Sequence, residues 1–177
     1  MSTSKRIALI TGSTDGIGQE TALALLRRDF AVLLHGRDPQ RVAAAVSAAR
    51  TALPDAQVDG VHADLSVQSE VRALRQEVRD ALARLGLPMR LDVLVNNAGV
   101  FLHQRAHTPE GVEMTLAVNH LGPFLLTHVL LPLLFVSTEG RVVHVSSVAH
   151  TRGRFDPDEL SARGLTCSKA RRMDCSR

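Results

Sequence analysis

The sequence predicts an α/β fold in which a parallel sheet is doubly wound, with helices on both faces. Short apolar runs alternate with longer segments whose apolar residues recur at helical spacing. The runs lack polar alternation, which favours strands buried on both faces. A glycine-rich segment, residues 11–18, directly follows the first run, as it does in folds that bind phosphate where a strand meets a helix.

The first two strands are expected at 7–10 and 31–34, which are continuous apolar runs of strand length. A helix is expected over 18–28, after the glycine-rich segment. A second is expected over 39–52, because Asp38 followed by proline is a typical helix entry.

The second half of the chain continues the alternation. Strands are expected over 58–62, 91–96 and 141–146. A helix over 67–85 is indicated by one apolar face. A longer apolar helix is expected over 111–134, with a bend near its Gly-Pro pair.

Right-handed crossovers predict the strand order 3-2-1-4-5, a Rossmann-type sheet, for one domain over residues 1–160. In such sheets ligands bind beyond the carboxyl ends of the strands, near the switch point between the first and fourth strands. Every polar motif described below follows a predicted strand end.

Composition indicates an ordinary globular protein, with 177 residues, 45% hydrophobic and 22% charged. No uncharged apolar stretch reaches the ~18 residues that a membrane helix needs, so no membrane span is expected. The first residues lack the apolar core of a signal peptide. A cytoplasmic location is the resulting expectation.

The last residues, 161–177, differ from the rest. They hold both cysteines and five basic residues against Asp174 alone, whereas the formal net charge of the whole chain is +3. We expect a disordered tail foreign to the fold, in preference to a nucleic-acid-binding segment. Neither the cysteine spacing nor the histidines match a metal site.

The glycine-rich segment reads Thr-Gly-Ser-Thr-Asp-Gly-Ile-Gly. A strand, a tight turn and a helix N-terminus direct unpaired N–H groups and the positive end of a helix dipole at one place, which suits a pyrophosphate. An ordinary strand-to-helix turn is the alternative, because turns use glycine freely.

Four more motifs follow the other strands in order: His-Gly-Arg-Asp at 35–38, Asp-Leu at 64–65, Asn-Asn-Ala-Gly at 96–99 and Ser-Ser at 146–147. Together with the glycine-rich segment, this set resembles the short-chain dehydrogenase/reductase family over residues 5–160. Residues 155–160, Phe-Asp-Pro-Asp-Glu-Leu, are most similar to its retinol-dehydrogenase-like branch.

The resemblance implies a bound nicotinamide dinucleotide. Around its pyrophosphate and adenosine ribose would lie Gly12, Ser13, Thr14, Asp15, Gly16, Ile17 and Gly18. Arg37 would meet the 2′-phosphate of NADP. The residues agree, because no carboxylate ends strand 2 to favour NAD. Asp64 and Leu65 would flank the adenine, and Asn97, Ala98 and Gly99 would line a ribose. Alternatively, Arg37 is a surface arginine and Asp64 caps a turn.

Asn119 and Ser147 match the family's catalytic helix asparagine and substrate-binding serine. Asparagine is a poor helix-interior residue, so Asn119 either has a functional role or marks a local helix irregularity. The family's acid/base lies in Tyr-x-x-x-Lys, yet this chain contains no tyrosine. Lys169 matches the lysine only if Leu165 replaces the tyrosine. The alternative alignment puts Arg172 there, and neither side chain replaces a phenol.

The resemblance therefore implies an NADP-dependent oxidoreductase that moves hydride between the cofactor and a carbonyl or alcohol carbon, here expected to be catalytically crippled. A non-catalytic NADP-binding remnant, or a truncated product without independent activity, is the alternative. The family pattern is expected to stop near residue 160, which would leave strand 141–146 as a bare apolar edge. The sequence predicts neither the substrate nor the oligomeric state.

Overall fold

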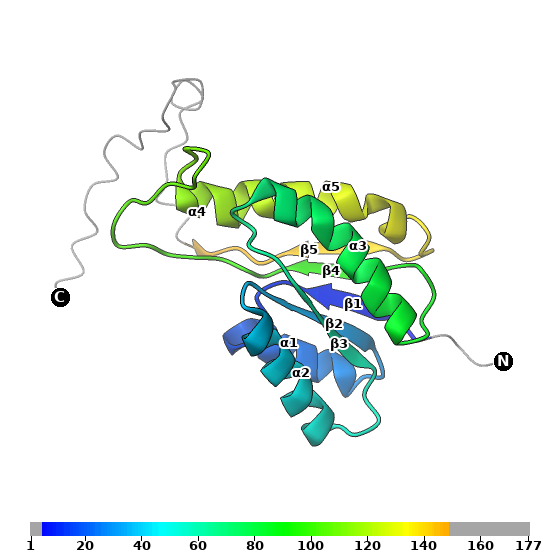
Figure 1. Cartoon of the computed structure of the whole chain (residues 1–177). Coiled ribbons are helices and arrows are strands. Elements are labelled where there is room, and N and C mark those ends of the chain that lie inside the picture. The colour runs from blue at the N-terminus through cyan, green and yellow to red at the C-terminus, as the bar shows by residue number, and fades with distance from the viewer. Residues whose placement is uncertain (1–4, 149–177) are drawn as a thin grey trace.

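The computed structural model describes residues 5–148 and consists of a parallel sheet with helices on both faces (Figure 1). The strands are β1 (Ile7–Ile10), β2 (Ala31–Gly36), β3 (Val58–His62), β4 (Val93–Asn96) and β5 (Arg141–His144). The helices are α1 (Gly16–Leu26), α2 (Pro39–Ala52), α3 (Gln68–Arg84), α4 (Met114–Leu116), the π-helical segment η1 (Ala117–Leu121) and α5 (Gly122–Leu134).

The strand order is β3-β2-β1-β4-β5, which confirms the predicted order. The register places Leu9 of β1 opposite Leu33 of β2 and Leu94 of β4. All four residues of β1 are fully buried, so this strand is covered on both faces as expected, whereas all four residues of β5 are exposed. Because β1 lies between β2 and β4, its carboxyl end is the switch point of the sheet.

Two apolar cores sandwich the sheet. Helices α3 and α5 pack on one face over Leu9, Leu33 and Leu94, and α1 and α2 pack on the other over Ile10 and Val32. Figure 1 shows α3 and α5 on one side of the strands and α1 and α2 on the opposite side. Alternate residues of one strand therefore pack into different cores. Because a shift of one residue would exchange the two sets, this alternation fixes the register.

The last helical run is irregular near the Gly-Pro pair, where a bend or break is expected from the sequence. The irregularity is the π-helical turn 117–121, which ends directly before Gly122 and Pro123, and the bend itself stays a prediction. Pro123 is the second residue of α5 and follows the π-helical turn closely. A Cβ at position 122 would lie 2.6 Å from the Leu65 carbonyl oxygen, so glycine permits this close approach.

The helical run Met114–Leu134 is, by length and composition, able to cross a membrane, a property that the sequence analysis did not indicate. The core helix of a globular domain passes the same test. Here α5 packs on the sheet, with Leu126, Leu130 and Leu133 buried in the core.

Strand β5 pairs with β4 alone and forms an edge of the sheet within residues 5–148, as predicted. It ends at His144 rather than Ser146. Val142 and Val143 are 36% and 45% exposed, so apolar side chains line this edge.

Buried Asp92 joins three segments at the amino ends of the strands. Its Oδ2 accepts a hydrogen bond from the Ile7 N–H at 2.7 Å, and its Oδ1 accepts one from the Ser137 hydroxyl at 2.6 Å. Arg90 Nε lies 3.1 Å from Oδ1 and supplies the opposite charge. A buried carboxylate is tolerated because it is paired and hydrogen-bonded.

Replacing Asp92 with alanine should lower the free energy of unfolding by about 3 kcal/mol, because it leaves buried donors and the Arg90 charge without their acceptor. Urea denaturation of the purified chain measures this. Asp80→Ala, which removes an exposed aspartate on α3, is the control and should change stability by less than about 0.5 kcal/mol. Equal effects of the two substitutions would contradict this account of Asp92.

Candidate functional site

Apart from Asn119, which lies in η1, the predicted site residues within 5–148 follow the carboxyl ends of the strands. The glycine-rich turn follows β1, Arg37 follows β2, Asp64 follows β3 and Asn97 follows β4. In a parallel sheet these ends share one edge (Figure 1). The fold therefore brings together segments that are far apart in the sequence.

The three glycines of the turn are required for different reasons. Gly12 has φ +61°, and a Cβ there would lie 2.8 Å from the Ala98 Cα. A Cβ at Gly18 would overlap the Gly12 carbonyl oxygen and lie 2.5 Å from Asn97 Nδ2. Gly16 has φ +53°, but a Cβ there would meet no atom within 4 Å. The first and last glycines permit close packing, whereas Gly16 supplies a left-handed turn beside open space.

The turn is joined to the end of β4 through Thr11. The fully buried Thr11 hydroxyl oxygen accepts hydrogen bonds from the N–H groups of Asn97 and Ala98, each at 2.9 Å. Asn97 Nδ2 in turn donates to the carbonyl oxygens of Thr11 and Gly12, at 2.9 and 3.1 Å. The Asn97 amide nitrogen thus holds the turn, and its expected contact with a ribose stays a prediction.

A second set of hydrogen bonds joins the turn to β2. The Ser13 N–H donates to the His35 carbonyl at 2.9 Å, and the His35 N–H donates to Ser13 Oγ at 2.9 Å. The Ser13 side chain is fully buried. It therefore supports the turn from its buried side and is not exposed on the surface of the turn. Sequence reasoning assigned no role to Thr11 or His35, because burial beneath a turn leaves no local pattern.

His35 lies directly under the turn. Its Nδ1 is 3.4 Å from the Gly12 nitrogen, which donates to it, and its buried Nε2 has no hydrogen-bond partner among residues 5–148. Burial lowers the pKa of His35 from 6.5 to about 4; His62 adds to this shift, and the backbone of Ala63 and the carboxylate of Asp64 oppose it. The imidazole is therefore neutral at physiological pH.

The N-terminus of α1 faces the same edge and has an uncompensated positive end. The first turn of α1 holds no acidic residue, and Asp15 at the N-cap makes no side-chain capping bond. The first N–H groups of a helix have no intrahelical acceptors. Ile17 is 71% exposed beside them. This arrangement is suited to an anion.

Two arginines border the turn. The Arg37 side chain is 76% exposed, with Nη1 3.9 Å from Asp64 Oδ2. Arg41 Nη2 lies 2.5 Å from Asp15 Oδ2. Asp64 Oδ1 also accepts from the Ser66 N–H at 2.9 Å, so the turn-capping alternative for Asp64 is realised alongside its ion pair.

Asn119 connects the π-helical turn to the segment after β4. Its Oδ1 accepts from the Val100 N–H at 2.8 Å, and its Nδ2 donates to the Val100 carbonyl at 2.9 Å. The local helix irregularity left open by the sequence is therefore present. Single π-helical turns occur often at functional sites. Gly99 lies beside this pair, with its Cβ position 3.5 Å from Asn119 Oδ1.

The remaining predicted residues differ in what the structure describes. Leu65 is buried, at 6% exposure, whereas Ala98 is only partly buried. Ser147 follows β5 and is exposed at the same end of the sheet. Lys169 and the tail 161–177 lie outside the described residues. Within residues 5–148, no group of three His, Cys, Asp or Glu side chains could hold a metal.

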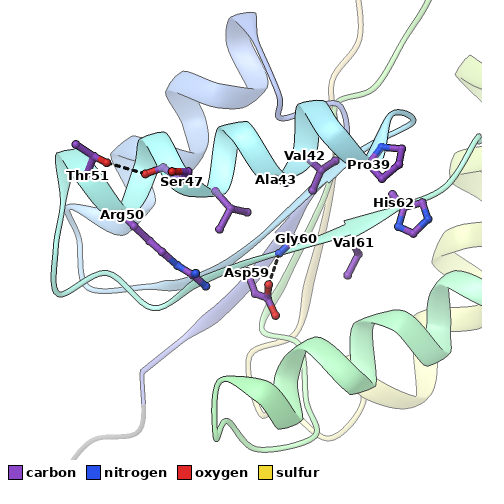
Figure 2. A pocket seen from close by; sticks show the side chains of 11 residues that line it. Pro39, Val42, Ala43, Ser47, Arg50, Thr51, Asp59, Gly60, Val61 and His62 are labelled. Carbon is purple, nitrogen blue, oxygen red and sulfur yellow. Dashed lines mark hydrogen bonds between the residues drawn. The ribbon is translucent and has the colours of Figure 1, made fainter.

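A groove of about 580 Å³ lies between α2 and β3 (Figure 2) and includes none of the predicted site residues. Two of its side chains form hydrogen bonds with the backbone of the edge strand β3. Arg50 Nη2 donates to the Val58 carbonyl at 2.8 Å, and Asp59 Oδ1 accepts from the Gly60 N–H at 2.8 Å. Such capping protects an edge strand from pairing with another chain, which explains the polar side chains of the groove without a ligand.

The sequence model of a family described as short chain dehydrogenase matches residues 6–156. Retinol dehydrogenase 12 of Homo sapiens is 39% identical over 157 residues, which cover 89% of this chain and 48% of that protein. Retinol dehydrogenase 13 of Homo sapiens is 36% identical over 156 residues, with coverage of 88% and 45%. The chain spans less than half the length of these two relatives.

Solved structures are also similar. A short chain dehydrogenase from Salmonella enterica matches with a TM-score of 0.69 and 30% identity, over 85% of this chain and 61% of that one. A protein from Escherichia coli CFT073, solved in complex with NADPH, matches with a TM-score of 0.68 and 28% identity, over 85% and 62%.

The lowered pKa of His35 predicts a pH-dependent stability. The unfolded chain binds a proton on this residue below pH ~6.5, whereas the folded chain resists it down to pH ~4, so stability should fall as the pH falls through this window. The His35 contribution should decrease by about 2 kcal/mol between about pH 7 and about pH 5. Urea unfolding at the two pH values measures it.

The variant His35→Asn removes this titration and should show a correspondingly smaller loss between the two pH values. His128→Asn, at an exposed position on α5, is the control and should retain the wild-type loss. An unchanged pH dependence in His35→Asn would refute the assignment to His35.

Proposed function

Because the chain belongs to the short-chain dehydrogenase family, in its retinol-dehydrogenase-like branch, we propose that the edge formed by the carboxyl ends of β1 and β4 binds NADP. The observation that carries the proposal is the turn of residues 11–18, whose close glycine contacts lead into an α1 N-terminus without a side-chain cap. Such a terminus stabilises a pyrophosphate through N–H groups and the helix dipole.

The residues present fit a dinucleotide. The space beside Gly16 is open, so a ligand can approach the backbone there. Gly12 to Gly18 would surround the pyrophosphate, Asp64 and Leu65 the adenine, and Asn97, Ala98 and Gly99 a ribose. Leu65 is buried and Ala98 is partly buried. These apolar residues are therefore better suited to pack against the cofactor than to make polar contacts with it.

The preference for NADP over NAD rests on Arg37. The Arg37 side chain is mostly exposed, and its ion pair with Asp64 is long, at 3.9 Å. The guanidinium is therefore available to a 2′-phosphate, which arginine binds in bidentate geometry. NAD binding normally uses a carboxylate after the second strand to accept from the ribose hydroxyls. The NADPH bound to the similar Escherichia coli protein supports the same choice.

The proposed reaction class is hydride transfer between the cofactor and a carbonyl or alcohol carbon of a small molecule. The nicotinamide supplies or accepts the hydride when bound. Ser147, exposed after β5, would donate a hydrogen bond to the substrate oxygen. Asn119 would keep the π-helical turn in place through its two bonds to Val100. The contribution of Lys169, and the cytoplasmic location expected from the sequence, stay predictions.

We further propose that these 177 residues, by themselves, bind NADP but catalyse little. The sequence contains no tyrosine, and general acid/base catalysis typically accelerates a reaction by about two to four orders of magnitude. The complete glycine-rich turn favours the retention of NADP binding even if catalysis is lost entirely.

The variant Arg37→Ala should bind NADPH about tenfold more weakly, because it loses a charge-assisted contact to the 2′-phosphate. NADH affinity should be unchanged, since NADH lacks this group. Titration followed by NADPH or NADH fluorescence measures both. Arg75→Ala, on the exposed surface of α3, is the control. Equal losses for the two cofactors would contradict the role of Arg37, and a wild-type chain that binds neither would remove the proposal.

Incubation of the chain with NADPH and a panel of aldehydes and ketones should give at most trace oxidation, followed by loss of NADPH absorbance. Any trace that arises at this site should disappear in Ser147→Ala. Robust turnover by the wild-type chain would show that another group replaces the phenol.

A further inference from the structure

Asp15 occupies the N-cap of α1 without capping it. Aspartate is a preferred N-cap residue because its carboxylate accepts from the helix N–H groups. The Asp15 backbone is extended, with φ −159° and ψ 178°, as an N-cap requires, yet its side chain makes no capping bond. Its Oδ2 accepts instead from Arg41 Nη2 at 2.5 Å. The carboxylate is therefore drawn away from the helix terminus.

Arg41 reaches Asp15 because the starts of α1 and α2 lie close together. Arg41 is the third residue of α2, whose N-cap Asp38 accepts from the Arg41 N–H at 3.3 Å. At the end of β2, a Cβ on Gly36 would lie only 2.7 Å from Thr14 Cγ2. This close approach brings the turn against the entry to α2, although Asp15 and Arg41 are 26 residues apart.

A carboxylate left free at this position would oppose an anionic ligand in two ways. It could accept from the N–H groups of the α1 N-terminus, which are the groups that a pyrophosphate needs. Its negative charge would also repel the two phosphates. The pairing with Arg41 counters both effects.

We propose that Arg41 is a positioning residue for dinucleotide binding, which holds the Asp15 carboxylate off the α1 N-terminus and neutralises its charge. The inference rests on the proposed cofactor function. It differs from a direct contact between Arg41 and the 2′-phosphate, because a residue that acts through Asp15 affects NADPH and NADH equally. A direct contact affects NADPH alone.

The test is the dissociation constant of NADPH and of NADH for the wild-type chain, Arg41→Gln, Asp15→Ala and the double variant. Arg41→Gln should weaken both cofactors about fivefold, as expected for one uncompensated charge near the phosphates in a partly screened site. In the Asp15→Ala background, Arg41→Gln should change both dissociation constants by no more than about twofold, because no carboxylate remains for Arg41 to mask.

Arg84→Gln is the matched control. It breaks another arginine–aspartate pair, Arg84 Nε to Asp59 Oδ2 at 2.8 Å, which is remote from the turn, and it should leave both affinities unchanged. Thermal melting of each variant separates weakened binding from loss of folding. A loss confined to NADPH, or one that Asp15→Ala does not rescue, overturns the inference while leaving the cofactor function intact. A wild-type chain that binds neither cofactor removes both.

Discussion

The geometry of the candidate site depends on the hydroxyl of Thr11. It accepts two backbone N–H groups from the segment after β4, and Asn97 returns two hydrogen bonds to the turn after β1. Strands β1 and β4 are adjacent in the sheet but 86 residues apart at this contact. This buried set of bonds fixes the turn after β1 against the segment after β4. Buried polar groups that are fully paired specify one arrangement.

Electrostatics at this edge follow a consistent pattern. Two carboxylates close to the turn each face an arginine, Asp15 with Arg41 and Asp64 with Arg37. Beneath them, His35 stays uncharged because it is buried. The α1 terminus thus keeps its positive end with no acidic residue in its first turn and no side-chain cap. The same turn would be a poor anion site if its N-cap aspartate were in the usual capping position.

Much of the fold and part of the site could be predicted from residue patterns. Val58–His62 and Pro39–Ala52 have the predicted bounds, because strand and helix periodicities and an Asp-Pro entry are local signals. The π-helical turn at 117–121 was predicted only as an irregularity. Within it, Asn119 pairs with Val100, a contact across 19 residues that no local pattern encodes.

The sequence by itself determined the class of fold, the strand order and the family, because buried strands, helix entries and spaced glycines each leave a local mark. Only the tertiary structure decided which polar residues support the turn from its buried side and which lie on its surface. Thr11, His35 and Arg41 have ordinary surroundings in the sequence, and their roles arise where neighbouring strands and helix starts meet. Hydrogen bonds and ion pairs act over a few ångströms in space, whatever the separation along the chain.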